Sequence, residues 1–97
     1  MFGIQLTQEA QDQYKLLLND KGLHKRLKAV QKTLQFLKHN LRHPGLQTHK
    51  FTSLKGHGGE EIFESYAEQN TPAAYRVFWH YGLEKQQITV ITITSHP

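Results

Sequence analysis

An arginine stands within an otherwise apolar stretch in the second half of the chain, the sequence AYRVFW at residues 74–79. If this stretch is a β-strand, alternation places Arg76 on the same face as Phe78 and His80. A guanidinium that is buried without a partner costs free energy, so Arg76 must pair with a carboxylate or face an open groove. Two interpretations follow: an ion pair with Glu64 or Glu68 on the preceding strand, of which Glu64 is the expected partner, or a planar fork directed at a phosphate group.

Other basic and proton-transfer residues accompany this arginine. His96 follows a β-rich stretch and is either a frayed, solvated terminal residue or a general acid or base held by its strand. Four further residues crowd the segment that leads into the predicted sheet, namely His49, Lys50, Lys55 and His57. Such a set suits RNA cleavage by the ribose 2′-hydroxyl: one group takes the hydroxyl proton, another protonates the leaving oxygen, and cations stabilise the phosphorane.

The seven histidines also raise the question of a metal site. His39 and His43 are four residues apart, but Pro44 ends the predicted helix there, and no histidine pair with a carboxylate has the usual ligand spacing. The chain has no Gly-rich phosphate loop before a helix, no HExxH and no EF-hand loop. The absence of Cys excludes a thiolate zinc site, a disulfide scaffold and a cysteine nucleophile. We therefore expect neither a metal nor a cofactor.

The first half of the chain predicts a strand followed by two helices. Weak alternation over residues 2–6 indicates a short strand, and Thr7 is placed to cap a helix that a left-handed Gly22 ends. From residue 23 to residue 41, apolar residues recur at steps of four and three, which predicts a second helix over about residues 23–40. So short a connection predicts an antiparallel helical hairpin.

The second half changes to a period of two, which is typical of strands. A short strand is expected at residues 51–54, and longer ones at 62–68, 74–81 and 87–95. Gly- and Pro-containing turns separate them. The order predicts one α+β domain over residues 1–97, in which the helical hairpin packs on one face of a mainly antiparallel sheet of about four strands.

The net charge of +4 conceals an uneven distribution of charge. Residues 21–59 hold nine Lys and Arg, five of the seven His and no acidic residue, whereas the rest of the chain is net acidic. This polarity predicts a polyanion or an acidic partner. Lys25, Lys28 and Lys32 on the second helix either form a surface for such a partner or are an ordinary solvated helix face.

The chain of 97 residues has the size of one small domain. It contains no apolar run of 18 residues, and its N-terminus lacks a basic segment followed by a long apolar one. We therefore expect a cytoplasmic protein without a membrane span.

Taken in order, these features resemble the RelE/ParE superfamily of toxins from bacterial type II toxin–antitoxin systems. The resemblance rests on the start FGIQLTQEAQDQYKLLL, the Leu-Lys-Gly element at residues 54–56, the strand AYRVFW and the ending ITITSHP. It covers nearly the whole chain and implies a compact, microbial-ribonuclease-like fold. For RelE-type members it implies cleavage of mRNA in the ribosomal A site.

Carried over by position, the resemblance implies a set of site residues. Lys55 matches the basic residue of the Leu-basic-Gly element, Arg76 the arginine of the central strand, and His96 the C-terminal His or Tyr. The resemblance implies transition-state stabilisation by Arg76 and acid–base catalysis by His96. Lys55, together with Lys50, is expected to bind phosphate.

One strand departs from the family pattern. Relatives commonly carry Arg or Lys after the Leu-basic-Gly turn, whereas this chain reads IFESYAE, with Glu64 and Glu68. Glu64 either neutralises Arg76 and weakens the cationic site or serves as the general base. Tyr66, on the same strand face, is able to stack on a base or donate a hydrogen bond.

The resemblance and the residues together predict a toxin that acts as a metal-independent, ribosome-associated mRNA endonuclease and inhibits translation. The residues expected to bind RNA are His49, Lys50, Tyr66, Lys25, Lys28 and Lys32. Two alternatives remain: a ParE-type toxin that inhibits DNA gyrase without nuclease activity, and a degenerate member that only binds its antitoxin. The expected partners are a cognate antitoxin, the ribosome and mRNA, with DNA contacted only through the antitoxin.

Overall fold

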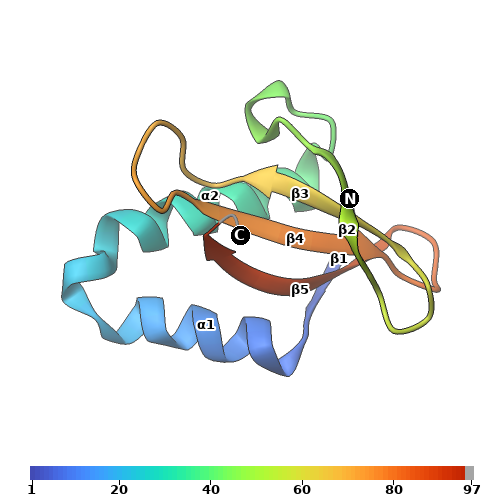
Figure 1. Ribbon diagram of the computed structural model, residues 1–97, viewed down its shortest axis with the longest axis horizontal. Coiled ribbons are helices and arrows are strands. Elements are labelled where there is room, and N and C mark those ends of the chain that lie inside the picture. Colours follow the sequence, from blue (N-terminus) through green and yellow to red (C-terminus); the bar gives the residue numbers. More distant parts are fainter. Residues whose placement is uncertain (96–97) are drawn as a thin grey trace.

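A computed structural model describes residues 1–95 of the chain (Figure 1). Strand β1 (Gly3–Leu6) leads into helix α1 (Gln8–Asn19), and α2 (His24–His39) follows. Thr7 caps α1 as predicted, because its hydroxyl accepts a hydrogen bond from the Ala10 amide at 3.1 Å.

The connection between the helices differs from the prediction. Residues Lys21–Leu23 form a 3-10 turn, and the Asp20 carboxylate caps it by accepting from the Gly22 amide at 2.9 Å. Gly22 does not adopt the predicted left-handed backbone conformation; among the described glycines only Gly59 does, with φ of 82°. The predicted left-handed stop at Gly22 is therefore wrong, because the Asp20 side chain satisfies the backbone at this break.

Four further strands follow: β2 (His49–Lys55), β3 (Glu61–Tyr66), β4 (Tyr75–Tyr81) and β5 (Gln87–Ser95). A short 3-10 helix, Pro44–Leu46, lies between α2 and β2. The strands described form one sheet in the order β1-β5-β4-β3-β2, with β1 parallel to β5 and the other neighbours antiparallel. The predicted α+β class is confirmed. The strand number is corrected from about four to five, and β2 is longer than predicted because its mostly exposed residues give little apolar pattern.

Both helices cover one face of the sheet, and the core lies between them and the three central strands (Figure 1). The buried core residues are Ala10, Leu17, Leu27, Val30, Leu37, Leu46, Val77, Trp79, Ile88, Val90 and Ile93. On β4, Val77 and Trp79 point toward the helices, so Arg76 and Phe78 lie on the opposite face. Alternation along β4 therefore fixes the face on which Arg76 lies, as predicted.

A β-bulge and the Thr7 side chain adapt β5 to the short strand β1. Phe78 pairs with Thr92 and Trp79 with Val90, which leaves Ile91 as the extra residue. Strand β1 pairs only as far as Val90, and Thr7 continues the edge by donating its hydroxyl to the Ile91 carbonyl at 2.8 Å. The start of α1 is thereby tied to the sheet. No helix within residues 1–95 is both long and apolar enough to cross a lipid bilayer.

Candidate active site

Four of the residues singled out from the sequence meet on the sheet face away from the helices. We call His49, Glu64, Tyr66 and Arg76 the arginine cluster. The strand register assembles it, because His49 of β2 lies opposite Glu64 of β3, and Tyr66 of β3 lies opposite Arg76 of β4. Residues that face each other across an antiparallel pair share a face of the sheet.

The guanidinium of Arg76 is held from three sides. Its Nη1 donates to the Glu68 carbonyl at 2.9 Å, and its central carbon lies 3.7 Å from the centroid of the Tyr66 ring. Its Nε lies 3.9 Å from the Glu64 carboxylate, so the predicted Arg76–Glu64 ion pair is present. The side chain is only 13% exposed, which makes it a fixed cation beside the open face rather than a mobile one.

Glu64 links Arg76 to a histidine. The Glu64 side chain is fully buried, and its Oε1 lies 2.7 Å from His49 Nε2, whereas the His49 side chain is 48% exposed. His49 Nδ1 lies 3.1 Å from the Gln47 carbonyl, which can only accept a hydrogen bond. Both ring nitrogens therefore lie close to oxygens that accept hydrogen bonds. The pair places a half-exposed imidazole in front of a buried carboxylate.

Tyr66 closes the arginine cluster. Its ring carries the Arg76 guanidinium on one face and meets the His49 ring edge-on, with centroids 6.0 Å apart. Cation–π stacking of this kind orients a guanidinium without neutralising it. An adjoining hollow of about 310 Å³ is lined by Phe51, Leu54, Phe78, Thr92, Thr94 and Ser95. The cluster therefore borders an apolar surface that is large enough to receive one flat ring.

Lys50 and Lys55 lie apart from the arginine cluster. Lys50 is opposite Phe63, on the other face of the sheet edge, and its Nζ is 3.5 Å from the Glu61 carboxylate. Lys55, at the end of β2, lines a separate hollow together with His80. His80 lies four residues beyond Arg76 on β4, a distance of about 13 Å along the strand. The structure does not bring these two lysines to Arg76.

The turn that follows Lys55 is organised by Glu60. The Gly58 amide donates to the Glu60 carboxylate at 2.9 Å, and the Gly56 amide donates to the Glu60 carbonyl at 3.0 Å. Hydrogen bonds from the backbone amides of Glu60 and Gly58 hold the pKa of the Glu60 carboxyl below its usual value of 4.5, and His80 and His57 add to this. The carboxylate stays ionised to lower pH than usual and fixes the turn.

The basic residues of α2 occupy a third region. Lys25, Lys28 and Lys32 are exposed on the helix, which covers the other face of the sheet from the arginine cluster. His96 lies outside the described residues. Of the predicted site residues, His49, Glu64, Tyr66 and Arg76 are brought together, and the lysines are spread over separate surfaces.

The sequence interpretation missed the pairing of Arg26 with Glu68, which holds Arg76 in place and which we call the clamp. Arg26 of α2 donates from Nε to the Glu68 carboxylate at 2.8 Å, and its guanidinium lies 4.2 Å from the centroid of the Tyr75 ring. The same Glu68 oxygen accepts from the Tyr75 amide at 3.0 Å, and the Glu68 carbonyl accepts from Arg76. Arg26 follows Lys25 in a run of basic residues, so nothing in the pattern distinguished it as the inward-facing one.

Comparison with solved structures places this arrangement in a known fold. A YoeB/ParE toxin from Agrobacterium tumefaciens superposes with a TM-score of 0.71 at 14% identity, covering 99% of this chain and 100% of that one. The YoeB–YefM toxin–antitoxin complex from Staphylococcus aureus gives a TM-score of 0.67 at 16% identity, covering 100% of this chain and 99% of that one. This chain has the RelE/ParE toxin fold.

The fold extends to an archaeal relative. The RelE–RelB complex from Pyrococcus horikoshii matches the RelE/ParE fold of this chain with a TM-score of 0.64 at 12% identity, covering 97% of this chain and 93% of that one. The resemblance predicted from the sequence is thus confirmed for the fold. No protein-family model and no curated protein matches the chain by sequence.

Proposed function

We propose that this protein is the toxin of a toxin–antitoxin pair and cuts mRNA on the ribosome without a metal. The observation that carries the proposal is the arginine cluster, a fixed guanidinium beside a histidine–carboxylate pair on the open face of a RelE/ParE fold. RNA cleavage by the ribose 2′-hydroxyl requires a cation for the phosphorane and groups that move protons.

In this proposal the 2′-oxygen forms a bond to phosphorus, the bond to the 5′-oxygen breaks, and a 2′,3′-cyclic phosphate results. Arg76 stabilises the charge that develops on the phosphoryl oxygens. His49 protonates the leaving 5′-oxygen through Nδ1 when that oxygen takes the place of the Gln47 carbonyl. His96 is the second proton-transfer group, and it accepts the 2′-hydroxyl proton.

Glu64 has a different role here from the general base that the sequence suggested. Its side chain is fully buried and contacts both His49 and Arg76, so it acts as a positioning residue for both. A carboxylate behind an imidazole orients the ring. Lys50, Lys55 and the exposed lysines of α2 contribute contacts to RNA phosphates.

Two of the neighbouring structures are toxin–antitoxin complexes, RelE with RelB and YoeB with YefM. They support a cognate antitoxin as the protein partner of this chain. In this proposal the antitoxin alone contacts DNA, and the toxin acts in the cytoplasm, where ribosomes and message are found.

The experiment that tests this function is induced expression followed by mapping of mRNA 5′ ends. Wild type should arrest growth and create new ends within coding regions, and Arg76→Ala and His49→Ala should abolish both while remaining folded. Lys85→Ala, a change at an exposed residue outside the cluster, is the matched control and should behave as wild type. Cleaved-DNA complexes of gyrase without mRNA cuts, or wild-type growth throughout, would contradict the proposal.

A further inference from the structure

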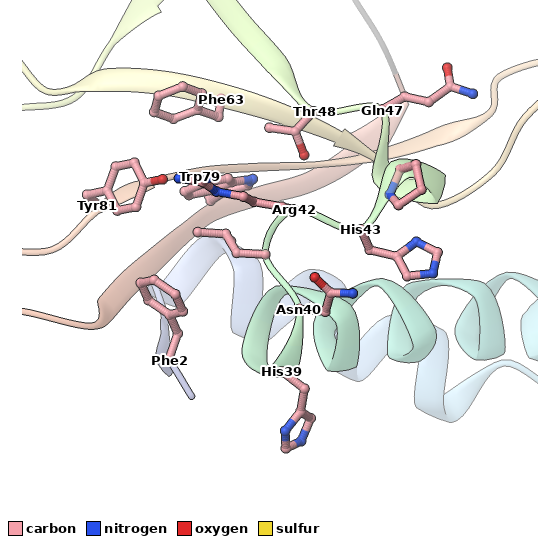
Figure 2. Close-up of a pocket in the computed structure, with 12 residues that line it drawn as sticks. Phe2, His39, Asn40, Arg42, His43, Gln47, Thr48, Phe63, Trp79 and Tyr81 are labelled. Atoms are coloured by element: carbon pink, nitrogen blue, oxygen red, sulfur yellow. The ribbon is translucent and has the colours of Figure 1, made fainter.

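A third hollow lies on the helix-covered side of the sheet, where α2 ends (Figure 2). Its volume is about 710 Å³, within the range of about 300–1,000 Å³ that small-molecule sites occupy. Residues 39–44, with Gln47, Thr48 and Phe2, form one side, and Phe63, Trp79 and Tyr81 form the other. The arginine cluster lies on the opposite face of the sheet, so this hollow is not part of it.

The sheet side of the hollow is an aromatic wall. Phe63 stacks on Trp79 with centroids 4.9 Å apart, and Tyr81 meets Phe63 and Trp79 edge-on at 5.6 Å and 5.2 Å. The Trp79 indole N–H donates to Ser65 Oγ at 2.9 Å, which fixes the plane of the ring. Tyr81 is 49% exposed whereas Trp79 is 1% exposed, so Tyr81 offers the accessible ring of the wall. Such a wall accepts another flat ring by stacking.

The helix side supplies positive charge. Figure 2 shows the Arg42 side chain running along the hollow toward Trp79 and Tyr81. Arg42 and His39 make no ion pair or side-chain hydrogen bond with any residue in the range 1–95. None of the twelve lining residues is acidic. An unneutralised guanidinium beside the exposed Tyr81 ring suits a ligand that joins a ring to an anion.

The end of α2 does not prevent an anion from binding there. The partial negative charge of a helix C-terminus opposes an anion, but by less than one charge-assisted hydrogen bond from Arg42 contributes. The Lys38 carbonyl is also already occupied, since it accepts from the Phe2 amide at 2.8 Å. The Asn40 side chain, which lines the hollow, adds an amide able to bond the edge of a base.

We propose that this hollow binds a nucleoside 5′-phosphate, with the base against Tyr81 and Phe63 and the phosphate on Arg42. A nucleotide is favoured over an acidic peptide because one ligand brings both the flat ring and a multiply charged anion. A peptide carries these on separate side chains. The site is independent of the proposed nuclease function, since its residues lie outside the arginine cluster.

The test uses the single tryptophan of the chain. Trp79 gives one indole N–H signal in a nitrogen-15 correlation spectrum, and its ring lines the hollow. Titration with adenosine 5′-monophosphate should shift this signal with a saturable curve. Adenosine alone and inorganic phosphate alone should each bind at least about tenfold more weakly, because each lacks one half of the recognition.

Variants decide whether the hollow is the site. Arg42→Ala and Tyr81→Leu should each weaken nucleotide binding by about tenfold or more, whereas Lys85→Ala should leave it unchanged. No Trp79 shift with the nucleotide, an equal response to inorganic phosphate, or wild-type binding by Arg42→Ala would overturn the proposal. So would displacement of the nucleotide by an acidic, aromatic peptide that binds more tightly.

A second titration distinguishes a free nucleotide from a nucleotide that is part of an RNA chain. An uncleavable 2′-O-methyl oligonucleotide that binds more tightly than the mononucleotide would identify a segment of RNA as the occupant, and weaker binding would identify a free nucleotide. Both outcomes support the nucleotide site. Arg42→Ala should still produce mRNA cuts if the nuclease function holds. The nucleotide site and the nuclease function can therefore be disproved independently of each other.

Discussion

The Glu64 carboxylate lies between the His49 ring, at 2.7 Å, and the Arg76 guanidinium, whose Nε is 3.9 Å away. Its side chain is 1% exposed and that of Arg76 is 13% exposed, so water screens the interaction little. A buried carboxylate is tolerated where charged or hydrogen-bonding groups lie beside it, and Arg76 and His49 are such groups here. The three side chains therefore form one buried charge unit, in which a change to one side chain affects the other two.

Glu64→Gln tests that unit at the residue scale. The amide keeps the shape of the side chain but removes the negative charge, which leaves Arg76 with its cation–π contact and backbone carbonyls alone. We expect the free energy of unfolding to fall by about 3 kcal/mol, measured by denaturant titration. The matched control is Glu61→Gln, which removes the exposed partner of Lys50 and should cost less than about 1 kcal/mol. Equal destabilisation of the two variants would contradict a buried charge unit.

At the scale of elements, the turn between β2 and β3 depends on one carboxylate. Glu60 accepts from the Gly58 amide, and a Cβ at Gly56 would clash with the Glu60 side chain. Because the pKa of Glu60 is lowered in the folded turn, ionisation favours the folded form. This contribution is present above the unfolded pKa, near 4.5, and disappears as pH falls through the lower folded value.

The prediction is a pH titration of the Gly58 amide signal. Its chemical shift should change with a midpoint below 4.5, and the signals of the turn should broaden as Glu60 is protonated. In Glu60→Gln this low-pH transition should be absent, and the turn should be mobile at neutral pH. A midpoint at or above 4.5 would show that the backbone amides do not stabilise the ionised carboxylate.

Elements also show what the sequence could and could not predict. Apolar residues at intervals of three and four positions predicted α2 to within one residue of its observed bounds, His24–His39. A helix that buries one face requires this spacing, so the sequence shows it directly. Alternation on β3 and β4 predicted that Glu64 and Arg76 meet, which carried most of the candidate site. Faces of single strands can be predicted in this way because side chains alternate strictly.

Relations between strands could not be predicted in the same way. Alternation sets His49 and Lys50 on opposite faces of β2. Which of the two shares the face of Arg76 depends on the register, which sets His49 against Glu64 and Lys50 against Phe63. No residue in the exposed strand β2 marks that register. The bulge at Ile91 also has no signal in the sequence, because a β-branched residue is equally typical of a regular strand. The clamp from Arg26 to Glu68 joins residues 42 positions apart and appears only in three dimensions.

On the scale of the whole molecule, the two faces of the sheet differ in what they present. The arginine cluster lies on the open face, and the helices on the other face carry the exposed Lys25, Lys28 and Lys32. The α2 part of the basic segment therefore lies on the other side of the sheet from the arginine cluster. In the proposed function, the ribosome contacts the helix surface while its message reaches the cluster.

Replacing Lys25, Lys28 and Lys32 together by Gln tests the helix surface. Each lysine that binds a phosphate contributes about 0.7–0.9 to the slope of log affinity against log salt, so the slope should be shallower by about two in the triple variant. Ribosome binding measured by sedimentation over a range of salt concentrations gives this slope. Lys15→Gln with Lys85→Gln, at exposed positions off that surface, is the control. An unchanged slope in the triple variant would mean that this surface is merely solvated.

The central claim, cleavage by the 2′-hydroxyl at the arginine cluster, is tested most directly by one measurement of purified protein on programmed ribosomes. Two messages are compared, one all-ribose and one with a single 2′-deoxy nucleotide at the cut position. The account predicts a cut of the all-ribose message that leaves a 2′,3′-cyclic phosphate, no cut of the 2′-deoxy message, and no cut of either by Arg76→Ala. Equal cleavage of both messages, or cleavage that survives Arg76→Ala, would contradict it.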